Sequence, residues 1–579
     1  MRFHDALPKR TVALLIVGLA VAGLAFAGGA TEPAATTTTD ETLDVTLWRT
    51  IDRFTPEERY RVVPYEAHYG VLEEMFNVRF QFTDIAQAAA NEMLNIMVAT
   101  NDLPDLVFSW SHMDKSFLDP ALLYADRQIY SLDQFSDHIP DYLAVLDEYP
   151  AIRKNVTSDD GHLLYFAEPN IYLESAFSGG PMLRKDWLDK LGLDIPDTYE
   201  EWLTVFEAFK TQDPNESGQD DTIPYVGAWG TLRVLANTLG VTNEFQMDGG
   251  PTGRVVYGPL LPGYRERLLF MREVVQNGYI NSDYMSFTGA VRDEAAARGI
   301  MGATFTGIGQ MDRWNLTMEQ SGLYPDHLIW AVAYPRGLDG NRHFDRAMIT
   351  KSATDAAFMI ARSAPEPARI AQIANYFYTE AGKLLTTFGV EGITYEMIDG
   401  FPVYTDLIMR NPEGLTPFDA RGKYVGIAGT PKPVDIRDVA QLSLSTPASR
   451  AAVMNVWTDV FEIEQNMPIP PVLMADEDAQ EFADIMADLQ TYVDTESSRM
   501  VEGLASIENG FDNFQATVRR MGAERALELM QRAVEQWQQR GGPYEYNMAR
   551  ADIDWSNLPM MSDQGAELVD PSMISPVRN

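Results

Sequence analysis

Residues 43–50 read LDVTLWRT and residues 78–85 read VRFQFTDI, two short runs in which apolar and polar side chains alternate. Alternation with a period of two, rich in β-branched and aromatic residues, predicts β-strands that bury one face. Between them, YEAHYGVLEEMFN (65–77) has the apolar spacing of an amphipathic helix. The sequence therefore predicts a β-α-β unit here.

The same pattern continues after the second strand. AQAAANEMLNIMVATNDLPD (86–105) predicts a helix that ends before Pro104, and LVFSW (106–110) predicts a short apolar strand. Strands that alternate with helices in this way form a parallel sheet covered by helices. The fold class predicted from these residues is therefore α/β.

Later segments extend this pattern along the chain. Thr198 and Glu201 predict a capping box before the helix YEEWLTVFEAFKT (199–211). AAFMIAR (356–362) predicts another strand, PARIAQIANYFYTEAGKLLTTF (367–388) one helix, and residues 478–540 mostly amphipathic helix. A chain of 579 residues exceeds what one core usually supports, so we expect two or more lobes.

The first residues have the features of a secretory signal peptide. Basic residues precede the short apolar run TVALLIVGLAVAGLA (11–25), and AFA (25–27) is a small-residue cleavage site. We therefore expect residues 1–27 to be removed and residues 28–42 to form a disordered linker; an uncleaved N-terminal anchor is the alternative. No Cys follows the apolar run, so we expect a secreted protein, periplasmic or extracellular, without a lipid anchor.

The net charge and the absence of common catalytic motifs disfavour several classes of function. The net charge of −39 disfavours nucleic acid and anionic membranes as partners. The sequence contains no HExxH, GxSxG, phosphate-cradling GxxxxGK[ST] or CxxC motif. We therefore expect a protein that is not an enzyme. A glycosidase carboxylate pair has no local spacing rule, so a polysaccharide-active enzyme stays as an alternative.

Residues 213–224, DPNESGQDDTIP, resemble the first part of a calcium loop. Asp213, Asn215 and Ser217 place an oxygen at every second position, and Gly218 follows where such a loop turns sharply. The twelfth position is Pro224, where an EF-hand loop has a bidentate Glu. A polar surface turn after a helix is the alternative interpretation.

Five motifs together carry a family resemblance. They are NDLPDLVF (101–108), DGHLLYFAEP (160–169), MLRKDWLDKLGLDIPDTYEEW (182–202), DPNESGQDDTIP (213–224) and FGVEGITYEMIDG (388–400). On these motifs the chain resembles the extracellular solute-binding proteins (family 1) of carbohydrate ABC importers. The match is closest to the large oligosaccharide-binding branch that includes alginate-binding proteins, and it covers roughly residues 43–540.

The resemblance implies a two-lobed periplasmic-binding-protein fold, type II and maltose-binding-like, with a hinge between the lobes. The N-terminal lobe is expected to combine residues 43–170 and roughly 353–435. The C-terminal lobe is expected to combine residues 171–352 and roughly 436–540, including the C-terminal helices. Chain crossings are expected near 168–176 and 350–355, and residues 541–579 form a tail.

The resemblance also implies an extracytoplasmic protein that captures an oligosaccharide or sugar derivative and delivers it to ABC permease subunits, and we expect a monomer. A polysaccharide-active enzyme and the binding component of a membrane sensor are the alternatives. Sugars stack their C–H faces on aromatic rings, so aromatics at strand ends are candidate ligands. These are Trp48, Trp110, Tyr172, Trp229 and Trp314, with core packing as the alternative for each.

Two charged residues complete the predicted sugar site. Arg184 follows a strand end and meets either the ligand or a structural Asp, and Glu391 lies in a turn-rich loop, where it accepts sugar hydroxyls or is simply solvated. Trp187 and Trp202 lie within amphipathic helices and are expected in the core.

Members of the resembled branch bind calcium at the loop in this position, which implies one structural Ca²⁺ here. In those members the acidic ligands are at loop positions nine and ten, and this chain keeps Asp221 but has Thr222 at the second. The implied ligands are Asp213, Asn215, Ser217, the carbonyl of Gln219, Asp221 and Thr222.

Overall fold

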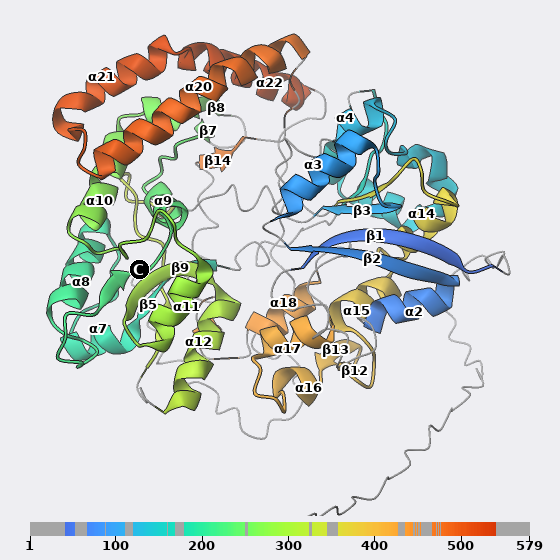
Figure 1. Cartoon of the computed structure of the whole chain (residues 1–579), viewed down its shortest axis with the longest axis horizontal. Coiled ribbons are helices and arrows are strands. Elements are labelled where there is room, and N and C mark those ends of the chain that lie inside the picture. Colours follow the sequence, from blue (N-terminus) through green and yellow to red (C-terminus); the bar gives the residue numbers. More distant parts are fainter. Residues whose placement is uncertain are drawn as a thin grey trace, which may run out of the picture. The chain divides into compact units, whose positions relative to one another are not determined.

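Figure 1 shows the computed structural model of the chain. It describes residues 41–51, 67–86, 89–109, 120–158, 160–167, 179–248, 253–322, 327–343, 357–425, 435–443, 446, 448–449, 452, 466–469, 472, 474 and 476–539. The chain divides into Met1–Glu41 and Thr42–Asn579, and the described helices and strands belong to the second unit. The expected signal peptide, the tail and both expected crossings lie outside the described residues.

The first sheet has the strand order β2-β1-β3-β11-β4. β1 (Leu43–Ile51) pairs in parallel with β2 (Val78–Ala86) and with β3 (Leu106–Ser109). α2 (Ala67–Phe76) and α3 (Ala90–Thr100) connect these strands, so the predicted β-α-β-α-β order is confirmed. β11 (Ala357–Ile360) and β4 (Phe166–Ala167) extend the sheet in antiparallel pairing.

Local chemistry explains how α3 ends and β3 begins. Asn101 adopts a left-handed conformation with φ 52° and caps α3 by donating to the carbonyls of Met97 and Val98. Four residues later, Asp105 Oδ2 accepts from both the backbone N–H and the hydroxyl of Thr46 at 2.7 Å. This contact fixes the start of β3 beside the middle of β1.

The core around the first sheet is built from residues 43–167 and 358–378. It is covered by α4 (Pro120–Ala125), the 3₁₀ helix η2 (Leu132–His138), α5 (Pro140–Glu148), α6 (Pro150–Val156) and α14 (Pro367–Tyr376). Tyr142 is fully buried and donates to the carbonyl of Tyr165 at 2.7 Å. That hydrogen bond lets the phenol lie inside without an unpaired hydroxyl.

The second sheet has the order β10-β5-β9-β6. β5 (Gly179–Arg184) runs antiparallel to β9 (Met301–Gly307) and to β10 (Ile329–Ala331), whereas β6 (Ile223–Tyr225) runs parallel to β9. Its helices are α7 (Lys185–Leu191), α8 (Tyr199–Thr211), α9 (Trp229–Asn237), α10 (Gly263–Gln276), α11 (Gly289–Ala297) and α12 (Ile308–Ser321).

The core of the second sheet confirms two local predictions. The side chain of Thr198 accepts from the N–H of Glu201 and the Glu201 side chain accepts from the N–H of Thr198, so the capping box is present. Trp187 and Trp202 are at most 1% exposed, as expected for helix residues that face the core.

The C-terminal helices pack against the core of the second sheet. They are α20 (Asp476–Val501), α21 (Ile507–Arg520) and α22 (Ala523–Gln539), which agrees with the predicted helical stretch (Figure 1). α20 contacts α10, where the hydroxyls of Tyr264 and Ser497 hydrogen-bond at 2.9 Å. A small sheet, β14-β7-β8, lies against α22 through β8; its strands are Asn466–Pro468, Phe245–Asp248 and Arg254–Tyr257.

A third, smaller core lies between residues 388 and 442. Its elements are α15 (Glu380–Phe388), the hairpin β12 (Tyr395–Ile398) and β13 (Phe401–Tyr404), α16 (Asp406–Met409), α17 (Pro417–Tyr424) and α18 (Ile436–Ser443). Arg421, Asp438 and the hydroxyl of Tyr404 form a buried polar group inside it, with the hydroxyl donating to Asp438 at 2.7 Å.

One predicted element is wrong. Residues 367–388 form two helices, α14 and α15, and not one. The side chain of Thr379 caps α15 by accepting from the N–H of Gly382, and a Cβ on Gly382 would lie 1.8 Å from the Tyr376 carbonyl oxygen. The apolar spacing continues across the break, so periodicity alone does not reveal it.

In the part of the chain that the structure describes, no helix has both the length and the apolar composition needed to cross a membrane.

Candidate functional site

The loop 213–222 folds its oxygen-bearing side chains toward one another. Asp213 accepts the backbone N–H of Ser217 with one carboxylate oxygen and that of Gly218 with the other, each at 3.0 Å. Asp221 Oδ1 accepts from the Asn215 amide and from the Ser217 hydroxyl, also at 3.0 Å. The loop therefore brings together four of the side chains predicted as metal ligands.

The donor chemistry of this loop fits a hard cation. Asn215 Oδ1 is buried and makes no hydrogen bond, which leaves a carbonyl-type oxygen unsatisfied. Calcium prefers carboxylate, amide and carbonyl oxygens, six to eight of them. Within the described residues, no group of three or more His, Cys, Asp and Glu side chains is arranged to hold a metal. Neutral oxygens would therefore have to complete any site around Asp213 and Asp221.

Backbone conformation and flanking contacts hold this loop in place. Asp213, Glu216 and Gly218 have positive φ, 48°, 57° and 70°, which lets the loop reverse direction within a few residues. The hydroxyl of Thr222 donates to the carbonyl of Phe209 in the last turn of α8 at 2.8 Å. The loop thus joins the end of α8 to the start of β6, and the Thr222 hydroxyl takes part in that junction.

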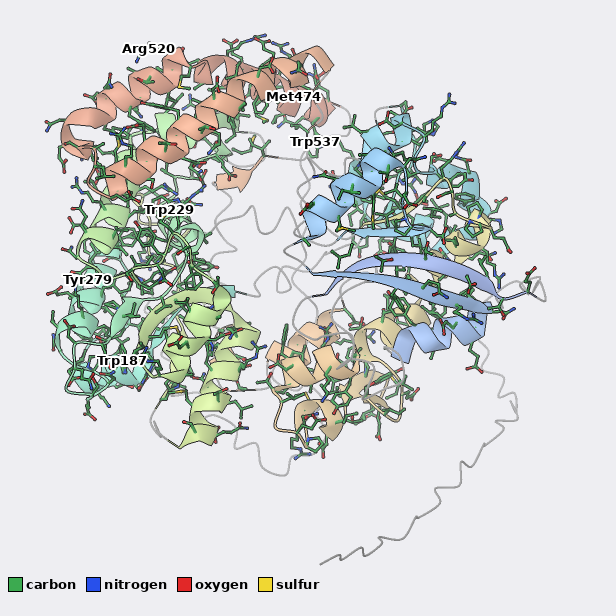
Figure 2. The ribbon with its side chains drawn as sticks, viewed as in Figure 1. Trp187, Trp229, Tyr279, Met474, Arg520 and Trp537 are labelled. Atoms are coloured by element: carbon green, nitrogen blue, oxygen red, sulfur yellow. The ribbon has the colours of Figure 1, made fainter. Side chains whose placement is uncertain are left out.

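An aromatic pair lies at the carboxyl end of the parallel strands β6 and β9. Trp229, the first residue of α9, donates its backbone N–H to the carbonyl of Tyr284 at 2.9 Å. The two rings lie 6.2 Å apart at 41°, and both residues are half-buried (Trp229 is labelled in Figure 2). Ligands of open α/β sheets bind at this edge, so the pair is a candidate to stack on a sugar, although both residues also pack against the core of the second sheet.

Tyr284 is a candidate that sequence reasoning missed. It lies in the loop NSDYMSF (281–287), which has no strand pattern before it. Its position follows from Asn281, whose side-chain oxygen accepts the N–H of Gly227 at 2.8 Å and so holds the loop beside the end of β6. Burial, followed by the nearby Glu502 carboxylate, raises the pKa of Tyr284. Its hydroxyl therefore stays protonated over a wide pH range.

Trp314 is 4% exposed, which favours the core alternative stated for it. Its indole N–H donates to Asp293 Oδ1 at 2.9 Å, and the Arg292 guanidinium lies 5.3 Å from its ring centre. The same carboxylate oxygen accepts from Gln310 at 2.6 Å. Sequence reasoning did not single out Asp293 or Gln310, because only tertiary packing brings α11 and α12 together.

A polar chain continues from this group along α12. Gln310 Oε1 accepts from Arg313 at 2.7 Å, and Arg313 in turn makes a two-pronged ion pair with Asp419 of α17, with Nε to Oδ2 at 2.9 Å. Thr416, which caps α17, also donates its hydroxyl to Asp419 at 3.0 Å. α12 is therefore tied to α11 on one side and to α17 on the other.

Arg184 and Glu391 have contrasting surroundings. Arg184 is 3% exposed, forms a two-pronged pair with Asp186 and lies over the ring of Trp187. This corresponds to the structural alternative stated for it. Glu391 is exposed in the turn between α15 and β12. Burial raises the pKa of the neighbouring Tyr395, and the Glu391 charge adds to that effect.

The side chains of the three remaining aromatic candidates lie outside the part of the chain that the structure describes. Trp48 lies in β1, paired with Thr83 and Val107, but nothing is described of its side chain. Trp110 and Tyr172 lie outside the described residues. The candidate site is therefore built on Trp229 and Tyr284, with Trp48, Trp110, Tyr172 and Glu391 as further predictions.

In sequence the chain is similar to a bacterial lipoprotein and to substrate-binding proteins of transporters. No protein-family model matches it. It is 23% identical to the lipoprotein LipO of Bacillus subtilis over 398 residues, which are 68% of this chain and 72% of LipO. It is 29% identical to FusA, a fructooligosaccharide ABC transporter substrate-binding protein of Streptococcus pneumoniae, over 223 residues. That match spans 37% of this chain and less than half, 41%, of FusA.

Structural comparison supports the fold that the sequence predicts. The crystal structure of the alginate-binding protein AlgQ2 without calcium ion matches with a TM-score of 0.68 at 20% identity, over 86% of this chain and 99% of AlgQ2. FusA in complex with kestose matches with a TM-score of 0.66 at 19% identity, over 86% of this chain and all of FusA. The predicted α/β solute-binding-protein fold and the resemblance to oligosaccharide-binding proteins of ABC transporters are confirmed.

Proposed function

We propose that this protein captures an oligosaccharide or sugar derivative outside the cytoplasm and delivers it to the permease of an ABC importer. The sequence relationship to a fructooligosaccharide ABC transporter substrate-binding protein carries this proposal. The fold shared with AlgQ2 and FusA along nearly their whole lengths agrees with it. In this proposal the protein binds its sugar without cleaving it and acts as a monomer.

The aromatic pair Trp229–Tyr284 supplies the physical basis for binding. A sugar ring presents an apolar C–H face, and a half-buried indole offers a matching surface that is already partly dehydrated. The Tyr284 hydroxyl, kept protonated by burial, donates to Glu502 at 3.5 Å and is proposed to accept from a sugar hydroxyl at the same place. Trp110, Trp48, Tyr172 and Glu391 are proposed to complete the site.

The calcium loop is proposed to be structural. Asp213, Asn215, Ser217, the Gln219 carbonyl, Asp221 and Thr222 would hold one Ca²⁺ and fasten the end of α8 to β6. The unsatisfied oxygen of Asn215 supports this. Two similar solved structures are AlgQ2 without calcium ion and an EF-hand mutant of FusA, so calcium loops occur among proteins of this fold. When bound, the ion would neutralise the loop carboxylates and cross-link the loop. It would not contact the sugar.

Localisation follows from the apolar N-terminal run and from composition. We propose export through the signal peptide and release outside the cytoplasm. LipO carries the name lipoprotein, but this sequence of 579 residues has no Cys to which a lipid could be joined. We propose that the exported chain carries no lipid anchor, with an uncleaved N-terminal anchor as the alternative.

A thermal-shift panel tests the function. Purified protein is heated with neutral fructo-oligosaccharides, alginate oligosaccharides and oligogalacturonates in parallel. A ligand present at about 100 times its Kd stabilises the folded state by about 2.7 kcal/mol, which such a melt detects. A shift with at least one sugar class supports the proposal. Shortened sugars in the same samples would instead indicate an enzyme.

A variant pair locates the site. We expect Trp229→Ala to lose the sugar-induced shift and Trp229→Phe, which keeps an aromatic face, to retain most of it. If Trp229→Ala keeps the full shift and folds normally, the sugar binds elsewhere.

A further inference from the structure

α17 of the third core meets α12 at the edge of the second sheet where the candidate sugar site lies. α12 begins at Ile308, directly after the carboxyl end of β9. α17 begins at Pro417, and its second residue, Phe418, lies against Gly309 in the first turn of α12. A helix from a separate apolar core therefore reaches the strand end at which ligands of open α/β sheets bind.

The glycine at position 309 allows the Phe418 ring to come this close to α12. A Cβ on Gly309 would lie 2.8 Å from both Cγ and Cδ1 of the ring and 3.2 Å from Cε1. Three neighbouring ring atoms at such similar distances mean that the missing Cβ would point at the face of the ring and not at its edge. Any larger residue at position 309 would therefore push the ring away.

An ion pair beside the ring fixes α17 in this position. Asp419, which follows Phe418 in the sequence, is 7% exposed and forms the two-pronged pair with Arg313 of α12. Gly309 and Arg313 are four residues apart, so both contacts lie on one face of α12. Two-pronged, charge-assisted hydrogen bonds are strong and directional. The pair therefore sets the orientation of the first turn of α17, and with it the place of the ring.

Each partner of this pair is also held by its own helix. Within α12, Gln310 Oε1 accepts from Arg313 Nη1 at 2.7 Å. At the start of α17, Thr416 Oγ1 donates to Asp419 Oδ2 at 3.0 Å and accepts the Asp419 N–H at 3.1 Å. Because both side chains are ordered by their own helices, forming the pair loses little conformational entropy. The pair is therefore suited to place Phe418 reproducibly.

The Phe418 ring keeps part of its surface open to solvent. The residue is half-buried and packs partly against the third core. A half-buried aromatic ring beside a strand end offers an apolar surface to the C–H groups of a sugar. Trp229 and Tyr284 pack against the core of the second sheet, so Phe418 approaches the same edge from a different core.

We propose that Phe418 is a further sugar-contacting residue and that Arg313 is a positioning residue, which acts through Asp419 to hold the ring at the sugar edge. The sugar contact rests on the proposed function. The placement of the ring by Gly309 and by the ion pair does not, so it is tested separately.

Gly309→Ala tests the placement of the ring without sugar. Replacing Gly by Ala in a helix usually stabilises it, by up to roughly fivefold in the unfolding equilibrium constant. Here the new methyl group meets the Phe418 ring, so we expect a loss of stability in urea unfolding, and Phe418→Ala in the same chain should remove that loss. Gly289→Ala is the matched control, because Gly289 lies in the first turn of α11 and a Cβ there meets nothing within 4 Å. An equal gain in both glycine variants overturns the placement.

Calorimetric titration with the sugar class that shifts the melting temperature tests the sugar contact. Phe418→Ala should weaken binding by about tenfold or more, whereas Phe418→Tyr, which keeps the ring, should retain most of the affinity. Arg313→Gln should also weaken binding by about tenfold, because the ring is no longer held. Arg410→Gln removes an ion pair with Asp406 at the end of α16 in the same core and should leave the affinity unchanged.

A double variant separates positioning from a merely structural role. If Arg313 acts through the ring, Arg313→Gln should cost no further affinity in a chain that already carries Phe418→Ala. Additive losses, or full affinity in a folded Phe418→Ala, overturn the assignment. If wild type binds no sugar of the panel, the proposed function fails and the sugar contact fails with it, while the comparison of Gly309→Ala with Gly289→Ala still decides the placement of the ring.

Discussion

Asp213→Ala should remove the stabilisation that calcium gives to this protein. In the structure, the Asp213 carboxylate accepts two backbone N–H groups, each at 3.0 Å, and so shapes the loop before any ion binds. Losing both contacts in a partly exposed loop should cost about 1–2 kcal/mol without calcium. The variant should therefore fold, with a modestly lower melting temperature.

The calcium term is larger and can be calculated. Ser217 and Thr222 are weak ligands compared with carboxylates, so we expect a Kd of about 10⁻⁴–10⁻³ M. At 10 mM free ion, linkage then gives about 1.4–2.7 kcal/mol of stabilisation, and the second sheet with its helices should melt about 3–10 °C higher. Wild type should show this rise, and Asp213→Ala should show none.

The assay is a melt after chelation, repeated with calcium and with magnesium. Magnesium should stabilise less, because it demands a tighter octahedral set of oxygens. Asp220→Ala is the matched control, since it removes an exposed carboxylate of the same loop and should keep the calcium response. An equal response in wild type and Asp213→Ala, or an equal loss in both variants, would refute the assignment.

The other predictions concern the aromatic residues and export. Trp229→Ala and Trp110→Ala should each weaken sugar binding by about 2 kcal/mol or more with the fold intact, measured by calorimetric titration. Trp314→Ala should instead destabilise the fold by about 3–5 kcal/mol in urea unfolding, as expected for a buried Trp. If this variant loses sugar binding at unchanged stability, Trp314 belongs to the sugar site. Intact-mass measurement of the native protein should find Gly28, or a residue within a few positions, first, and a retained Met1 would contradict signal cleavage.

The first strands and helices of the first sheet were predictable because short stretches of sequence determine them. The alternation in residues 43–50 and 78–85 and the apolar spacing between them specify β1, α2 and β2 without reference to the rest of the chain. The capping box at Thr198 is equally local. The break at 377–379 was not predictable from spacing, because a side-chain cap and one close glycine contact create it.

The candidate site was predictable in part. Trp229 could be found because it follows a strand and a turn, whereas Tyr284 depends on the long-range contact between Asn281 and Gly227. Trp314 was placed among the sugar candidates from its position in the sequence and not from a helical pattern, and its burial depends on the packing of α12 against Asp293 of α11.

Calorimetric titration of the purified chain with the sugar class that shifts its melting temperature, followed by recovery and analysis of the sugar, tests capture without turnover most directly. We predict saturable binding of one oligosaccharide per chain, with the sugar recovered at its original length and the binding lost in Trp229→Ala. Absence of binding to every fructo-, alginate- and galacturonate oligosaccharide, or recovery of shortened sugars, would contradict the proposed function.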